Sequence, residues 1–555
     1  MTAAESTYAF EPHERPLMPG SPATPQHPMP RRVGYFAIGV LISLSSGFAN
    51  AALAGNLPQI QGALGLTSPE AAWLSAAYSI GNVCTSFILV KFRQQFGLQR
   101  LTRIFLPGFV ALCGAQLFVH TYGLELALRT AAGAVASGFT PLGFFYIMQA
   151  MPAKARLAGM IMGVGLGQVA LPLTRVISPS LLTGGEIQTL FELEFGLALL
   201  CLGAVALLRL PPSERAEVLE PLDFLTFALF APGVALVCAV FAEARIVWWT
   251  TAWLGYALAG GLLLIGIAMV VEHNRANPLL NTRWLASRDM LRFAIIAATM
   301  RVLLSEQTFG SVGLLTLLGM GQDQLVTLYA IVTVATVAGL AASLLTLDPK
   351  DLIRPLLISL ALIVLGALMD ARATNLTRPA TVYASQAIIA FAAIFFIGPT
   401  MMTGMLRALS KGPSHIVSYS MVFSMSQTVG GLAGASLLGT LQVVRERLHS
   451  NVLASSISLA DPQVAARVQQ LGGAYARVLG DPMLRQAQGA ALLAQQVSRE
   501  ANILAYNDVF IVIAALAAAA FVWMGARWLV FRIRGEAPLA AELAALQALL
   551  SRRTG

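Results

Sequence analysis

The stretch ATMRVLLSEQTFG, residues 298–310, places Arg301 and Glu306 inside an apolar run that extends from Phe293 to Met320. Burying either a guanidinium group or a carboxylate without a partner is unfavourable. A glutamate in apolar surroundings favours its protonated form, so it can bind and release a proton, and a nearby arginine favours release. These two residue types therefore predict proton or ligand chemistry, provided that the surrounding elements hold both side chains inside the protein.

The composition indicates what those elements are. Of 555 residues, 57% are hydrophobic and only 11% are charged, and the mean hydropathy is +0.71. Soluble domains carry about 25% charged residues. The chain is therefore predicted to be an all-α polytopic membrane protein rather than a soluble enzyme or binding module.

Apolar segments long enough to cross a bilayer, about 20 residues each, recur along the whole chain. They predict about fourteen transmembrane helices. The expected spans are 33–54, 70–90, 104–121, 123–150, 156–181, 189–209, 222–242, 249–271, 291–319, 324–346, 352–370, 379–407, 414–443 and 507–531.

The positive charges alternate between loops. The loops after spans one, three, five and nine contain no lysine or arginine, whereas the intervening loops are basic. Because basic loops stay in the cytoplasm, this pattern predicts an even number of spans and cytoplasmic N- and C-termini.

The net charge of +9 is thus explained by topology. No basic stretch is interleaved with aromatic residues as in a nucleic-acid site. No nucleic-acid partner is expected.

The pattern of spans predicts a domain organisation. A Pro-rich tail should be disordered and cytoplasmic, two six-helix bundles should flank a linker with two additional transmembrane helices, and the second bundle should carry a polar external insert of helices. The boundaries are 1–32 for the tail, 33–209 for the first bundle, 210–290 for the linker, 291–531 for the second bundle, 444–505 for the insert and 532–555 for a cytoplasmic C-terminal tail.

Catalytic and cofactor-binding motifs are not found in the sequence. The six histidines are scattered, and neither a nucleophile elbow nor a phosphate-binding loop is present. The four cysteines, Cys84, Cys113, Cys201 and Cys238, lie in apolar segments without metal-ligand spacing. We expect no enzyme activity, no cofactor and no metal.

Several short motifs carry a family resemblance. RTAAGAVASG (129–138) is similar to an arginine–glycine motif of span four, and PAKAR (152–156) to the basic turn after it. GQVALPLTRV (167–176) resembles the antiporter motif of span five, and LVKFRQQFGLQR (89–100) the basic loop after span two. With six, two and six helices, the chain resembles the major facilitator superfamily. Within it, the chain resembles the fourteen-helix drug:proton antiporters of the EmrB/QacA type. It is most similar to the inner-membrane members of Gram-negative tripartite efflux systems.

The resemblance implies the major facilitator fold and proton-coupled efflux, but one expected group is missing. Relatives carry a carboxylate near the middle of span one, whereas LSSGFANAAL (44–53) contains none. At about 1.5 Å per residue, Arg301 lies roughly 12 Å and Glu306 roughly 20 Å from the inner end of span nine. Both therefore bracket the bilayer midplane, where transporters bind their substrates. Glu306 becomes the candidate proton carrier, and Arg301 a candidate for proton coupling or substrate binding; a local pair between them remains the alternative.

A second group of charges lies nearer the outer surface. Arg129, Arg175 and either Glu192 or Glu194 fall at similar depth in three consecutive spans. Arg129 is a candidate for proton coupling or substrate binding, since charges inside the membrane are functional by default. The alternative is a structural anchor. Arg175 with Glu192 or Glu194 is predicted to form a structural charge network, because paired charges need no cargo.

The predicted function is proton-coupled efflux of amphipathic small molecules, such as drugs or toxic compounds, across a bacterial inner membrane. We expect the insert to dock a periplasmic adaptor protein, which passes the cargo to an outer-membrane channel. The alternative is that the insert packs on itself as a cap. Two other functions stay open: a dedicated exporter of an endogenous acid or siderophore, and a transporter-like sensor that moves nothing.

Overall fold

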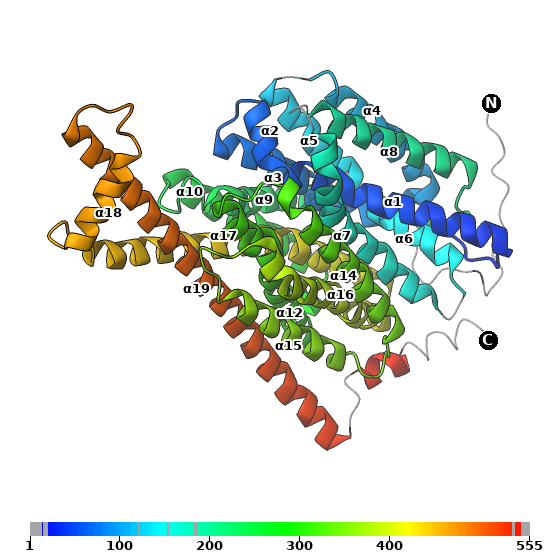
Figure 1. The fold of residues 1–555 in the computed structure, drawn as a ribbon. Helices are drawn as coiled ribbons and strands as arrows, with labels where there is room; N and C mark the ends of the chain where they lie inside the picture. Colours follow the sequence, from blue (N-terminus) through cyan, green and yellow to red (C-terminus); the bar gives the residue numbers. More distant parts are fainter. Residues whose placement is uncertain are drawn as a thin grey trace.

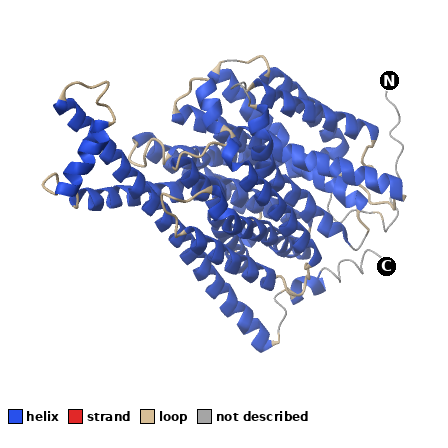
Figure 2. Cartoon of the chain, in the orientation of Figure 1, coloured by secondary structure: helices blue, strands red, loops and turns tan. Residues whose placement is uncertain are grey.

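The computed structural model describes residue 14 and residues 20–119, 121–152, 155–182, 187–535 and 539–545. Every regular element in this part of the chain is a helix, apart from one isolated bridge between Pro22 and Ser213 (Figure 2). Twelve of the described helices are long and apolar enough to cross a membrane. The chain is therefore a multi-pass all-α membrane protein.

Each of the fourteen predicted spans corresponds to helical structure. In chain order these are α1 (Met29–Gly55), α3 (Ser68–Phe96), α4 (Leu98–Gln116), α5 with α6 (Tyr122–Ala136 and Phe139–Ala150), α7 (Arg156–Leu181), α8 (Gln188–Leu207), α9 (Pro221–Glu243), α10 (Ala252–His273), α12 with η2 and α13 (Arg288–Leu304, Glu306–Gly310 and Ser311–Leu317), α14 (Val326–Leu345), α15 (Ile353–Asp370), α16 (Tyr383–Lys411), α17 (Pro413–Ser455) and α19 (Pro482–Arg534).

Short helices connect or extend these spans. They are α2 (Leu57–Ala63), α11 (Thr282–Leu285), η3 (Asp323–Leu325), η4 (Pro379–Val382) and α18 (Pro462–Gly473). The ninth span is interrupted because η2 is a single π-helical turn that begins at Glu306. Such turns are rare and often lie at functional sites, since they rotate the side chains that follow.

The helices pack in two groups with a pair beside them (Figure 1). Helix α1 contacts α6, α7 and α8, while α14, α15, α17 and α19 form contacts with α12 or α16. The two groups meet along α7, α14 and α16, and α9 packs on both α3 and α17. Helix α9 thus lies where the first group of helices meets the second, and α10 packs on α9.

Buried ion pairs fasten the additional helices to the first group. The Lys91 ammonium of α3 lies 2.8 Å from Asp223 at the start of α9. Arg275, just after α10, pairs with Asp223 at 2.9 Å and with Glu272 at 2.6 Å. Arg275 also binds Glu220, and this hydrogen bond holds the pKa of the Glu220 carboxyl below its usual range. Charge complementarity therefore fixes α9 and α10 in place.

The tail predicted to be disordered is ordered from residue 20 onward. Its backbone pairs with the linker, since the Ala23 amide donates to the Pro212 carbonyl at 2.8 Å. Gln149 donates to the Ala23 carbonyl and Arg156 to the Thr24 carbonyl, each from the end of a neighbouring helix. The prediction was wrong for residues 20–28 because composition does not reveal partners supplied by distant helix ends. Residues 1–13 and 15–19 lie outside the described part.

Most of the polar insert extends two spans, and one separate short helix, α18, lies between these extensions. Helix α17 runs for 43 residues and α19 for 53, about 65 and 80 Å, which far exceeds a hydrocarbon core of about 30 Å. Both helices project beyond the bundle and carry α18 at their tip, on the side away from the start of α1 and the end of α19 (Figure 1). Asp508 of α19 joins the pair by binding Arg445 and His449 of α17, each at 2.6 Å.

Close packing in the first group depends on glycines of α7. A Cβ added at Gly163 would lie 2.5 Å from Phe144 Cβ of α6, and one at Gly159 would lie 3.3 Å from Met148 Cα. The distance at Gly163 leaves no room for a side chain, and the distance at Gly159 is tight. The spacing of four residues places both glycines on one helix face, where small residues let backbones approach closely.

Gly163→Ala is expected to destabilise the protein by about 1–3 kcal/mol, because the new methyl group overlaps the α6 backbone. The matched control is Gly196→Ala on α8, where an added Cβ meets nothing within 4 Å. The control should be neutral or slightly stabilising, since alanine favours helix by up to about 1 kcal/mol. Thermal unfolding of both purified variants in detergent measures the difference. Equal midpoints would contradict the packing described for α6 and α7.

Candidate functional site

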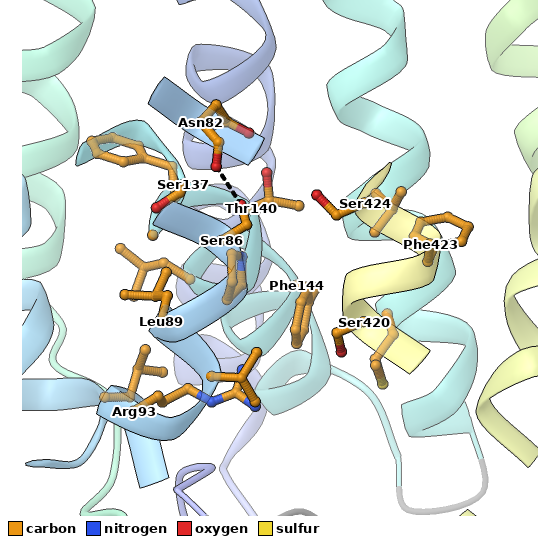
Figure 3. A pocket seen from close by; sticks show the side chains of 18 of the residues that line it. Asn82, Ser86, Leu89, Arg93, Ser137, Thr140, Phe144, Ser420, Phe423 and Ser424 are labelled. Carbon is orange, nitrogen blue, oxygen red and sulfur yellow. Dashed lines mark hydrogen bonds between the residues drawn. The ribbon is translucent and has the colours of Figure 1, made fainter. Parts of the chain in front are cut away.

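A cavity of about 470 Å³ lies between the two groups of helices. It is lined by residues of α1, α3, α6, α7, α12, η2, α13, α14, α16 and α17. A second cavity of about 320 Å³ shares Asn82, Thr140 and Gln427 with it and therefore adjoins it. Figure 3 shows this second cavity, with Ser86 and Arg93 of α3 facing Ser420 and Phe423 of α17 across it. Together they form a compartment inside the membrane region of a size that suits a small molecule.

Arg301 lines the larger cavity from the last turn of α12. Its Nε donates to the Gln427 carbonyl of α17 at 3.0 Å. The side chain passes close to Gly431, where an added Cβ would lie 3.1 Å from that same nitrogen. No carboxylate pairs with Arg301 among the described residues. The local pair between Arg301 and Glu306 that the sequence left open is therefore not formed.

Glu306 is fully buried and does not line the cavity. Its Oε1 accepts hydrogen bonds from the Ser311 hydroxyl and from the Gln386 amide, the latter at 3.0 Å. Its Oε2 is buried with no hydrogen-bond partner. The π turn causes this orientation, because it begins at Glu306 and ends just before Ser311.

Asp370, at the end of α15, completes a carboxylate pair with Glu306. The Gln386 amide nitrogen lies 2.8 Å from Asp370 Oδ2, and the Ser311 hydroxyl lies 3.2 Å from the same oxygen. Ser385 binds the other oxygen of Asp370. Thus one amide and one hydroxyl bridge two carboxyl groups from different helices.

A count of hydrogen atoms shows what this arrangement requires. The Gln386 amide nitrogen has two hydrogens but three acceptors within hydrogen-bond distance, namely Glu306, Asp370 and the Ser311 hydroxyl, the last at 2.6 Å. The Ser311 hydroxyl has one hydrogen yet lies within bonding distance of both Glu306 and Asp370. Both contacts can be hydrogen bonds only if one carboxyl group supplies a hydrogen itself. The site therefore suits two carboxyl groups that share one proton, as expected where like charges are buried together.

Sequence reasoning missed Asp370. It lies at the last residue of a predicted span, where an acid is ordinarily explained by the membrane surface. The available signal was the polar content of span twelve, since Ser385 and Gln386 follow one another inside an apolar helix. Depth alone does not reveal which helices face each other.

Arg129 forms a separate buried network within the first group. Its Nε lies 3.3 Å from Glu125 one turn earlier, and its Nη1 lies 3.5 Å from Glu194 of α8. The Cys113 thiol also donates to Glu194, at 3.8 Å. Arg129 is 1% exposed and does not line either cavity. This geometry favours the structural anchor over a site that contacts cargo.

The predicted network of Arg175 with Glu192 or Glu194 has different members in the structure. Glu194 pairs with Arg129, and Glu192 is exposed on α8. Arg175 instead lines the larger cavity, with its guanidinium 5.1 Å from the centre of the Tyr329 ring. The prediction that these residues form one network was wrong, because equal depth in the bilayer does not determine which way a helical side chain points.

Comparisons with known proteins agree with this architecture. The family model of the Major Facilitator Superfamily matches residues 39–435, so the chain belongs to that superfamily of transporters. It is 24% identical to the multidrug export protein EmrB of Haemophilus influenzae over 499 residues, which cover 84% of this chain and 89% of the relative.

Solved structures show the same fold at low identity. The human organic anion transporter MFSD10 matches with a TM-score of 0.51 and 12% identity, over 89% of this chain and 100% of that one. The nucleoside transporter NupG matches with a TM-score of 0.51 and 11% identity, over 89% of this chain and 99% of that one. At such identities the likeness concerns the fold alone.

Arg129→Met is expected to destabilise the protein by about 3–5 kcal/mol, because it leaves the buried carboxyl groups of Glu125 and Glu194 without their cation. The loss of stability should grow as the pH rises, because keeping Glu125 and Glu194 protonated in the folded state then costs more free energy. Unfolding midpoints at two pH values measure both effects. The control is Glu192→Gln, an exposed acid on the same helix as Glu194. Unchanged stability of Arg129→Met would show that the network contributes nothing.

Proposed function

We propose that the protein is a proton-coupled exporter of amphipathic small molecules in a bacterial inner membrane, with both termini in the cytoplasm. The Glu306–Asp370 pair carries this proposal. It is buried, it lacks a cation partner among the described residues, and it can hold one proton between two carboxyl groups. The similarity to a protein whose name describes multidrug export supports efflux as the direction of transport.

Gln386 provides the connection between proton and cargo. It lines the larger cavity and also donates to both carboxyl groups. When the Glu306–Asp370 pair holds a proton, that hydrogen completes the hydrogen bonds of Ser311 with the two carboxyl groups. When the proton leaves, the Gln386 amide must stabilise the additional negative charge. A change at the carboxyl pair therefore shifts a side chain of the cargo cavity, which is the coupling that alternating access requires.

A contact between the two groups of helices supports alternating access. The Gln322 amide, beside η3, donates to the Gly55 carbonyl at 2.9 Å and to Gln59 at 3.1 Å. These partners belong to the first group, at the end of the bundle that carries the insert. A few hydrogen bonds of this kind can break and reform during each cycle at small net free-energy cost.

The insert supports a role for a partner. Several of its large apolar side chains are exposed at the projecting tip, among them Val452, Val478 and Met483. Ordering so many residues outside the bundle has an entropic cost, which burial against a partner would offset. We propose that the insert docks a periplasmic adaptor protein, which passes the cargo to an outer-membrane channel.

A second function, a transporter-like sensor, is distinguished by flux. A sensor would bind cargo in the same cavity but would show no transport driven by a proton gradient. Both functions predict binding, so only measurements on sealed vesicles separate them.

Glu306→Gln is expected to abolish export driven by a proton gradient, because glutamine resembles the protonated acid but cannot release the proton. Exchange of cargo between equal pools should persist, since it needs no net proton movement. Uptake of a fluorescent amphipathic cargo into inverted vesicles measures both processes. The matched control is Glu192→Gln, which removes an exposed acid. Full gradient-driven export by Glu306→Gln would exclude the carrier role.

Replacing residues 456–481 with a short Gly-Ser linker is expected to abolish capture of the adaptor while leaving vesicle transport intact. The replacement removes α18 but keeps the paired stem, including the contact of Arg445 with Asp508. Pull-down of a coexpressed adaptor, with vesicle uptake measured in parallel, tests both parts. Capture that persists would place the docking surface elsewhere.

A further inference from the structure

The larger cavity has charge of one sign only. Arg175 of α7 and Arg301 of α12 line it, whereas none of the described residues that line it is an aspartate or a glutamate. Glu306 does not neutralise the cavity, because its carboxyl group is fully buried behind Gln386. The surface offered to a cargo molecule is therefore positive.

Neither arginine is compensated by an acid within the described part of the chain. Arg301 uses its Nε to donate to the Gln427 carbonyl, which leaves its Nη atoms for another acceptor. Arg175 lies against the face of Tyr329, and its Nε is buried without a hydrogen-bond partner. Uncompensated cations inside a membrane are unfavourable, so such residues usually meet a charged partner or a ligand.

The two arginines come from different groups of helices. Arg175 belongs to α7 of the first group and Arg301 to α12 of the second. A guanidinium group is a planar fork of donors that matches the two oxygens of a carboxylate or another oxyanion. A ligand bound by both would therefore bridge the groups whose relative movement transport requires.

The remaining lining describes the rest of the ligand. Leu171, Leu304 and Ile394 contribute apolar surface, while Asn50, Gln168 and Gln427 add neutral polar groups. A cavity of about 470 Å³ accepts a small molecule rather than a peptide or polymer. Apolar walls combined with two cations match a molecule that has an apolar body and an anionic end.

We infer that the cargo is an amphipathic organic anion that binds in the larger cavity, where Arg301 and Arg175 supply the positive charge. This inference rests on the proposed function, since it names the chemical class that the exporter would carry. It also has an energetic consequence. A membrane potential that is negative inside favours the exit of an anion, so the potential and the entering proton would drive export in the same direction.

The test compares three ligands of nearly equal shape: naphthaleneacetate, naphthaleneacetamide and naphthylethylamine. Binding to the purified full chain in lipid nanodiscs is measured by equilibrium dialysis, without any gradient. We expect the anion to bind about tenfold or more tightly than the amide, because a desolvated charge pair forms only with the anion. The amine should bind weakest. Equal or tighter binding of the amine would overturn the inference, and this comparison needs no substitution.

Substitutions then locate the site. Arg301→Gln and Arg175→Gln should each reduce the preference for the anion over the amide by about tenfold, while the amide affinity stays the same. Lysine at either position should retain part of the preference, because it keeps the charge but loses the fork. The control is Arg245→Gln, since Arg245 does not line the cavity. An undiminished preference in both glutamine variants would overturn the assignment.

Flux measurements separate this inference from the proposed function. Anion-selective binding without flux driven by a proton gradient would contradict the exporter but retain the anion site. A different result would be proton-driven flux of the amine or amide together with no preference for the anion in binding. It would contradict the anion site but agree with the proposed export function.

Discussion

The cost of placing a charge in a medium of low dielectric constant determines how the interior of this protein is organised. Insertion of a single charged side chain at the bilayer centre costs about 2.5–3.5 kcal/mol on translocon scales. The structure meets this constraint in three ways. Arg129 is paired with two carboxyl groups, Glu306 and Asp370 share neutral donors, and Arg175 and Arg301 face a cavity. Of these three arrangements, only the first pairs opposite charges within the described part of the protein.

The proposed function assigns proton and cargo to two separate places. In it, the carboxyl pair reaches a favourable state by binding a proton, and the cavity arginines reach one by binding an anion. Gln386 links them, because it contacts both carboxyl groups and lines the cavity. Under the proposed function, proton binding lies in the second group of helices, about one side chain away from the cargo cavity. The π turn at Glu306 is the local feature that makes this separation possible.

The spans were predictable from sequence because the thickness of a bilayer fixes the length of an apolar helix. The positions of Arg301 and Glu306 followed from the same reasoning. The direction of each side chain did not, because apolar helices in a membrane lack the polar face that orients a helix in water. For this reason Asp370 and Glu125, which lie at the ends of their spans, were missed, and Arg175 was assigned to the wrong partners. The order of residues 20–28 was equally hidden, since its partners are the distant side chains of Gln149 and Arg156.

In the proposed cycle, cargo and proton move in opposite directions through one protein. The most direct measurement uses sealed proteoliposomes loaded with naphthaleneacetate and a trapped pH-sensitive dye, with no initial pH difference and with the membrane potential clamped. As the anion leaves down its gradient, the account predicts that protons enter and that the interior becomes more acidic than in protein-free liposomes. Efflux of the anion without acidification of the interior would contradict the account.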